Sequence, residues 1–139
     1  MYGALEISTS GMIAQRDRLA AISANLANRD SIGPDGTPYR AKRVFFQVGD
    51  PTAATAAGRK LGVHIAQIRD DPSAFGSHWD PNSPFAQKSG PQQGYVLDSN
   101  VDPVNEQVNA MEAGRAYEAN VVAAEATKAL VAQSLRLLA

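Results

Sequence analysis

The sequence predicts an α+β fold, in which long N- and C-terminal helices pack as a coiled coil beside a small β-rich central domain. Seven of the eight prolines lie between Pro34 and Pro91, together with all four phenylalanines and the single tryptophan. The two ends of the chain are rich in alanine, and their apolar residues recur at helical spacing. The predicted order is therefore helix, turn-rich β segment and helix, in domains of residues 1–30, 31–98 and 99–139.

The N-terminal helix is predicted to run from about residue 3 to residue 28. Its main apolar residues lie seven apart, with one more three positions after the third of them: Leu5, Met12, Leu19, Leu26 and Ile22. This spacing places them on one face of a helix. The alanines between them favour helix and let a neighbouring backbone come close. The turn-forming residues of "NRDSIGPDGTP" then end the helix.

Three strands are predicted in the centre, at residues 43–48, 62–71 and 94–99. In the first strand the alternation of Val44, Phe46 and Val48 predicts that one face is half-buried. The segment "DPTAATAAGRK" has few large apolar side chains, so a mobile surface loop is expected there. The segment between the second and third strands is expected to be irregular.

The C-terminal helix is predicted from residue 103 to residue 138, a length of roughly 50 Å. Asp102 can cap its first turn, and proline suits the first helical position because its missing N–H would be unpaired there. Its apolar stripe shifts register half-way along and comprises Val101, Val104, Val108, Met111, Tyr117, Val121, Leu130, Leu135 and Leu138. Small side chains bury little area, so we expect the isolated subunit to be marginally stable and to gain stability from neighbours.

Composition excludes several classes of function. The formal net charge of −1 argues against a dedicated nucleic-acid binder and a polybasic membrane anchor. The chain has no cysteine, which excludes thiolate zinc sites and cysteine nucleophiles. The N-terminus lacks the pattern of a secretory signal, and no segment resembles a membrane span. These rules alone would predict a cytoplasmic protein.

Candidate catalytic residues are few. His64 lies in a predicted strand, where packing is the ordinary role, and His78 lies in the irregular segment, where a surface loop is expected. Asp70 and Asp71 are adjacent, so in a strand they would point to opposite faces, and the end of a strand is the simpler interpretation. The oxygen-bearing residues of "DPNS" lack the remainder of a calcium-binding loop.

One basic cluster follows Tyr39 and comprises Arg40, Lys42 and Arg43. Its ordinary role would be to protect an exposed strand edge against unwanted pairing. A contact with an acidic neighbouring molecule is the alternative interpretation.

The chain resembles the bacterial axial flagellar proteins, the rod and hook family. The resemblance begins with "STSGMIAQRDRLAAISANLAN" and continues through "GPDGTPYRAKRVFFQ", "GVHIAQIRDDPSAF", "WDPNSP", "GYVLDSNVDPV" and "NAMEAGRAYEANV". It covers nearly the whole chain in order, and the later segments are similar to a proximal rod member in particular. Only "NRDSIG" and "AAEATK" depart from the family pattern. The residues that carry the family motif are Ser23, Asn25, Leu26, Ala27, Asn28, Arg115, Ala116, Tyr117 and Asn120.

This resemblance implies a structural subunit that stacks helically into the rod, joins the membrane ring to the distal rod and hook, and transmits torque. It implies export by the flagellar type III system without a cleaved signal, and thus a periplasmic basal-body location in place of the cytoplasm. The implied partners are further copies, other rod proteins, membrane-ring and rod adaptor proteins, and the export apparatus. No enzymatic activity, cofactor, metal, nucleic acid or small-molecule substrate is implied.

Under this interpretation the apolar stripes of both helices form the coiled coil and the assembly interface. The alternatives are another axial rod or hook subunit and a helical interaction module unrelated to flagella. A small hydrolase would need a convergent polar site, which the sequence does not reveal.

Overall fold

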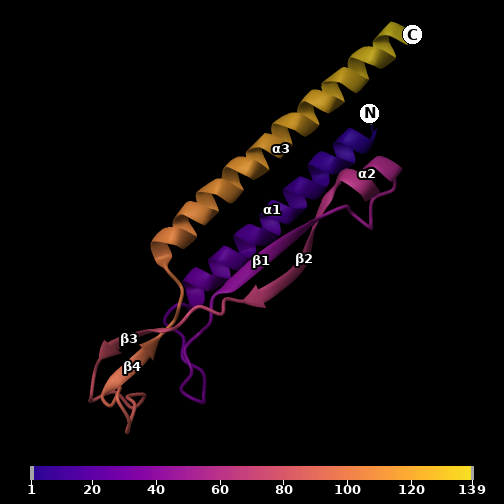
Figure 1. Cartoon of the computed structure of the whole chain (residues 1–139). Helices are drawn as coiled ribbons and strands as arrows, with labels where there is room; N and C mark the ends of the chain where they lie inside the picture. The colour runs from indigo at the N-terminus through magenta and orange to yellow at the C-terminus, as the bar shows by residue number, and fades with distance from the viewer. Residues whose placement is uncertain (1, 139) are drawn as a thin grey trace.

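The computed structural model describes residues 2–138 and has the predicted α+β class, with a long helix at each end of the chain (Figure 1). The elements in chain order are α1 (Tyr2–Asn28), β1 (Lys42–Val48), α2 (Ala56–Leu61), β2 (Val63–Asp70), β3 (Gly76–Trp79), β4 (Tyr95–Asp98) and α3 (Pro103–Leu138). The bounds of both long helices agree with the sequence prediction within a residue or two. Helix ends depend on local caps and on proline, which can be read from neighbouring residues.

Helices α1 and α3 lie side by side and run in opposite directions, so the two ends of the chain meet at one end of the molecule (Figure 1). At about 1.5 Å per residue, the 36 residues of α3 span about 54 Å and the 27 residues of α1 about 40 Å. The C-terminal end of α3 therefore reaches past the start of α1. Asp102 caps α3 as predicted, because its Oδ1 accepts a hydrogen bond from the Val104 N–H at 2.9 Å.

Strands β1 and β2 form an antiparallel ribbon that packs along α1 on the side away from α3 (Figure 1). The Val63 N–H donates to Ser10 Oγ at 3.0 Å and so ties the start of β2 to α1. The expected half-buried face of β1 is wrong for two of its three residues, since Phe46 is exposed and Val48 is 74% exposed. No second layer covers the outer side of this ribbon among the described residues, so only the part that touches α1 loses its contact with water.

The expectation of a mobile surface loop at "DPTAATAAGRK" is wrong, because most of the short helix α2 lies in this segment. Thr55 caps this short helix by accepting a hydrogen bond from the Gly58 N–H. The carboxylate of Glu6 in α1 accepts hydrogen bonds from the backbone N–H groups of Ala54 and Thr55, at 3.1 and 3.0 Å, and from the Thr55 hydroxyl. These bonds come from a residue 49 positions earlier in the chain, so a local interpretation of "DPTAATAAGRK" could not reveal them.

Strands β3 and β4 form a second antiparallel ribbon at the opposite end of the molecule from the chain termini (Figure 1). The sequence predicted β4 but not β3, which lies in the segment expected to be irregular. Trp79 and Tyr95 pair edge to face across this hairpin, with ring centroids 5.1 Å apart. Gly94 has φ +83°, and a Cβ there would lie 2.5 Å from the Trp79 ring. Glycine therefore makes this cross-strand contact possible.

The buried core is thin and consists mostly of small side chains. Its apolar members are Ala14, Ile22, Ala41, Val96, Val101, Ala113 and Ala124. Larger apolar side chains are exposed on both long helices and on both ribbons. Since hydrophobic stabilisation scales with buried apolar area, the single subunit has a weak core for its length.

Candidate assembly interface

Helices α1 and α3 contact each other mainly through small and polar side chains. The less exposed positions of α3 recur three and four residues apart and include Glu106, Ala110, Ala113, Asn120, Ala124, Thr127 and Val131. Ala113 has no exposed surface. On α1, Gly11 is buried, and a Cβ at this position would lie 2.8 Å from both amide atoms of Asn120. Small residues therefore set the distance between the two helices.

The large apolar residues of α3 do not lie in this contact. Val104, Val108, Leu130 and Leu135 are all at least half exposed, and Met111 is 59% exposed. The apolar stripe of α3 was predicted to form the coiled coil, but its members Val108 and Met111 lie outside the contact with α1. Val121 is half-buried and Tyr117 is 38% exposed, so both lie at the border of the contact. Apolar spacing identified the large residues of α3, but the positions of α3 that face α1 are mostly alanine, asparagine and threonine.

The predicted stripe of α1 is more enclosed than that of α3. Ile22 is buried, whereas Leu5, Met12, Leu19 and Leu26 are half-buried. Helix α1 lies between α3 and the β1–β2 ribbon, so two of its sides are covered (Figure 1). Residues of both covered sides, such as Ser8, Ser10 and Ala14, are consequently buried as well. Coiled-coil packing of α1 and α3 stays a prediction.

Asn25, a residue of the family motif, links α1 to β1 and α3. It is 1% exposed. Its Nδ2 donates to the Lys42 carbonyl at 2.9 Å and to Glu106 Oε2 at 3.2 Å. Its Oδ1 accepts from the Lys42 N–H at 2.8 Å and from the Tyr39 hydroxyl at 3.1 Å, and burial raises the pKa of that phenol. This buried amide is fully hydrogen-bonded, so it fixes how the three elements meet.

The other motif residues lie either in the contact between the two helices or on the solvent-exposed surface. Asn120 faces Gly11 in the helix contact and donates to the Ala116 carbonyl at 2.8 Å. Asn28 donates to the Ala24 carbonyl within α1. The side chains that face solvent are those of Ser23, Ala27 and Arg115.

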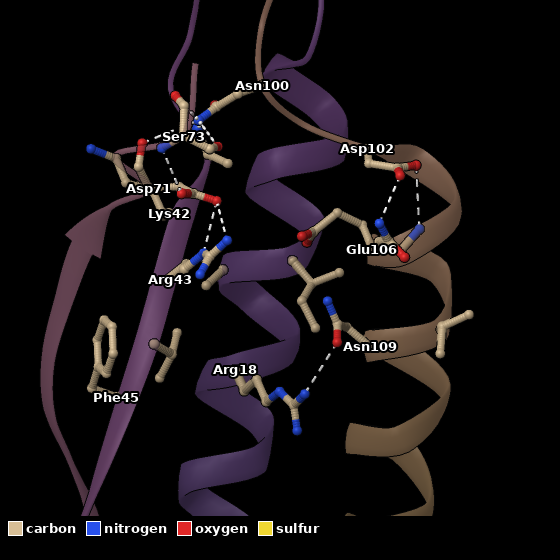
Figure 2. A pocket seen from close by; sticks show the side chains of 16 residues that line it. Arg18, Lys42, Arg43, Phe45, Asp71, Ser73, Asn100, Asp102, Glu106 and Asn109 are labelled. Atoms are coloured by element: carbon tan, nitrogen blue, oxygen red, sulfur yellow. Dashed lines mark hydrogen bonds and ion pairs between the residues drawn. The ribbon is translucent and has the colours of Figure 1, made fainter. Parts of the chain in front are cut away.

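A polar clasp joins the ends of β2 and β4 beside the groove drawn in Figure 2. Asn100 accepts from the Ala41 N–H at 2.8 Å and donates to the Asp71 carbonyl at 3.1 Å and to Ser73 Oγ at 2.9 Å. Arg43 donates to the Asp71 carboxylate through Nε and Nη2, at 2.8 and 2.6 Å (Figure 2). A groove of about 580 Å³ lies between this clasp and the first turns of α3.

The hydrogen bond from the Ser73 N–H, with the Arg43 guanidinium, holds the pKa of Asp71 below its usual value. The basic cluster, which was predicted to guard a strand edge or to meet an acidic neighbour, makes contacts within its own chain. Strand β1 pairs with β2 alone in its sheet, so the edge-guarding role stays a prediction. Arg40 donates to the carbonyls of Asp71 and Ser73 at 2.8 and 2.9 Å, and it stacks over Phe75. Lys42 pairs with Asp70 across the β1–β2 ribbon. The acidic partners of this cluster therefore belong to the same chain.

The two histidines take part in ordinary contacts. His64 bonds the Gly49 carbonyl. His78 lies on β3 rather than in a loop, with Nδ1 2.9 Å from Asp98 Oδ1. Among residues 2–138, no group of three acidic or histidine side chains is arranged to hold a metal ion. Within the same residues, no helix is both long and apolar enough to cross a membrane.

Comparison with known proteins matches both ends of the chain to flagellar families. Residues 5–34 match the family of flagella basal body rod proteins, and residues 92–137 match the C-terminal family of the flagellar basal body rod FlgEFG proteins. A flagellar basal-body rod protein FlgC from Yersinia enterocolitica is 43% identical over 95% of this chain and 93% of its own length. The chain belongs to the FlgC family of flagellar basal-body rod proteins.

Further FlgC proteins support this assignment. The FlgC of Salmonella typhimurium is 40% identical over 95% of this chain and 93% of its own length. The FlgC of Bacillus subtilis is 33% identical over 98% of this chain and 97% of its own length. FlgC proteins are structural components of the flagellar rod, and membership of the family implies assembly with other rod components.

The two matched segments correspond to α1 and to β4 with α3. They meet in space, although they lie at opposite ends of the sequence. The candidate assembly interface is therefore the outer surface of the helix pair. Asn25 and Asn120 lie within the pair, and the large apolar side chains of α3 lie on its outside.

Proposed function

We propose that the chain is a structural subunit of the proximal rod that polymerises helically, links the membrane ring to the distal rod and hook, and transmits torque. The observation that carries this proposal is the similarity to FlgC proteins along about 95% of the chain, including both terminal helices. A rod built from repeated subunits needs each subunit to present interaction surfaces on several sides. The exposed apolar side chains of the helix pair supply such surfaces.

The outer face of α3 is the surface best suited to lateral contacts. Val104, Val108, Met111 and Val122 all lie on it, and each is at least half exposed. Monomeric proteins rarely leave such apolar surface uncovered, and covering it would add the stabilisation that the thin core lacks. In this proposal the small-residue contact of α1 and α3 forms the coiled coil within the subunit, and the large side chains form contacts between subunits.

The same proposal includes export by the flagellar type III system without a cleaved signal, and a periplasmic position in the basal body. A subunit with a thin core is easily unfolded, which suits passage through a narrow channel. Its partners would be further copies, other rod proteins, the membrane-ring and rod adaptor proteins, and the export apparatus. No cofactor or small-molecule substrate takes part.

The test is deletion of the gene, followed by complementation with an epitope-tagged chain. We expect the deletion strain to lose motility and rods, and the tagged chain to restore both and to copurify with basal bodies. Cells that swim without the gene, or purified basal bodies that lack the tagged chain in a complemented strain, would refute the proposal.

A further inference from the structure

The outer side of α3 carries a second regular row of side chains, opposite the side that contacts α1. We name as the outer row every residue that is reached from Val104 in alternating steps of four and three residues, as far as Ala129. Such a row follows one side of a helix. Each member lies two residues before a member of the row that runs from Glu106 to Val131 along α1, and two residues turn a helix by about 200°. The outer row therefore points away from α1.

The outer row is exposed along its whole length and is mostly apolar on both sides of its centre. Val104 is 69% exposed, Met111 59% and Val122 65%. The β1–β2 ribbon covers α1 on its far side, so it does not reach this face of α3 (Figure 1). Apolar residues at this spacing are typical of the seam through which one helix packs against another.

The centre of the outer row is charged. Arg115 and Glu118 are neighbouring members of the row, and both are exposed. Within residues 2–138, the ion pairs of the chain involve neither of them. The best partner for this row is therefore one that places a carboxylate beside Arg115 and a basic group beside Glu118.

A second copy of the same row meets this requirement when the two α3 helices run in opposite directions. In an antiparallel pair centred between Arg115 and Glu118, each Arg115 lies beside Glu118 of the second copy, so two ion pairs form. The same register places Met111 beside Val122 of the second copy. In a parallel pair without axial offset, identical residues meet, so the two arginines would repel each other and so would the two glutamates.

The remaining layers of the antiparallel register are largely compatible with it. Val104 lies beside Ala129 of the second copy, which places a larger apolar side chain against a small one. Val108 lies beside Glu125 and forms the one kind of layer without a matching side chain. The other three kinds of layer join apolar or oppositely charged side chains.

We propose that the outer row binds the outer row of a second copy, so that the free chain forms an antiparallel dimer through α3. The contact joins identical surfaces, so it closes after two chains and does not extend as a filament. It covers the apolar residues that the proposed function assigns to contacts within the rod. The dimer would thus keep unassembled chains from polymerising, and it would have to open before a subunit joins the rod. Only this consequence rests on the proposed function, whereas the dimer itself does not.

Charge reversal in the purified full-length chain tests the dimer, with sedimentation equilibrium as the measurement. We expect the unsubstituted chain to dimerise, and Arg115→Glu or Glu118→Arg to weaken dimerisation at least about tenfold, because each variant sets like charges side by side. An equal mixture of the two single variants should form mixed dimers, and the double variant Arg115→Glu/Glu118→Arg should dimerise like the unsubstituted chain. Lys60→Glu is the matched control, since this exposed residue of α2 lies on the other side of α1, and it should leave the dimer unchanged (Figure 1).

Cysteine pairs test the direction of the two helices, because the chain has no cysteine of its own. A mixture of Met111→Cys and Val122→Cys chains should form a disulfide-linked dimer under mild oxidation. Met111→Cys chains alone should not, because the two copies of this position lie about 16 Å apart along the antiparallel pair.

A chain that stays monomeric at all concentrations, or that forms open polymers, overturns the inference. A dimer that Arg115→Glu leaves intact overturns it as well. Met111→Cys chains that link to each other as readily as to Val122→Cys chains would overturn the antiparallel direction and with it the proposed contact. Cells that swim without the gene refute only the proposed function, so the two proposals can fail separately.

Discussion

Replacement of Asn25 tests whether one buried amide holds the helix pair on the ribbon. The side chain of Asn25 takes part in four hydrogen bonds. In two of them its partner is the backbone of Lys42: the amide oxygen of Asn25 accepts from the Lys42 N–H, and the amide nitrogen of Asn25 donates to the Lys42 carbonyl. In Asn25→Ala those two backbone groups lose their partners inside the protein, at a cost of about 1–2 kcal/mol each. The partners on Tyr39 and Glu106 are half-buried and can regain water. We therefore expect a loss of about 3 kcal/mol in the free energy of unfolding.

Urea denaturation of the purified chain, followed by helix circular dichroism, measures this loss. Asn28→Ala is the matched control, because its side chain makes one bond within α1, to the Ala24 carbonyl, and it should cost less than about 0.5 kcal/mol. Asn25→Asp nearly keeps the shape of the side chain but loses both donated bonds and places a second carboxylate beside Glu106. We expect it to cost at least about 2 kcal/mol near neutral pH. An Asn25→Asp chain as stable as the unsubstituted one would refute this account.

Three further predictions concern the helix contact, the stripe of α1 and pH. Gly11→Ala should lower the melting temperature because its Cβ meets the Asn120 amide, whereas Gly114→Ala, with open space at its Cβ, should raise the free energy of unfolding by up to about 1 kcal/mol. Leu19→Asp should give a chain that is exported but not assembled, as scored by secretion and swimming assays, because a half-buried carboxylate would lack a partner. The Thr55 hydrogen bonds lower the pKa of Glu6 below its usual 4.5, so the chain should be most stable above that pH and lose stability as the pH falls below it.

Each of these predictions has an outcome that contradicts it. Equal melting temperatures for the two alanine variants would show that Gly11 does not set the helix distance. Swimming cells with Leu19→Asp would remove that residue from the assembly interface, with the exposed position Ser89→Asp as the tolerated control. Urea midpoints measured from about pH 7 to about pH 3.5 should fall less in Thr55→Val than in the unsubstituted chain, and an identical fall would rule out the bond to Glu6 as the cause.

The helices and their ends could be predicted from the sequence because their signals are local. Asp102 and Pro103 begin α3 next to one another in sequence, and the turn residues after Asn28 end α1. The side of α3 that faces α1 could not be predicted in the same way. Periodicity identifies large apolar residues such as Met111, but close helix packing selected Ala113 and its small neighbours.

The candidate site was predicted only in part, for a related reason. Asn25 stood out because it belongs to a recognisable motif. The clasp of Asn100 with Asp71 and Ser73 had no such signal, since its members are far apart in the sequence and each residue type is common in loops. The basic cluster was visible, but its true partners lay on a neighbouring strand that only the folded chain brings close.

The pairing of the first helix with the last has a consequence for the newly made chain. During synthesis, the end of α1 leaves the ribosome about 75 residues before the start of α3, so at 5–20 residues per second α1 waits roughly 4 to 15 s for that partner. A chain that stops early never covers this side of α1 and stays open to proteases. The fold thereby distinguishes complete chains from truncated ones, and the cell can clear incomplete chains before they compete for a place in an assembly.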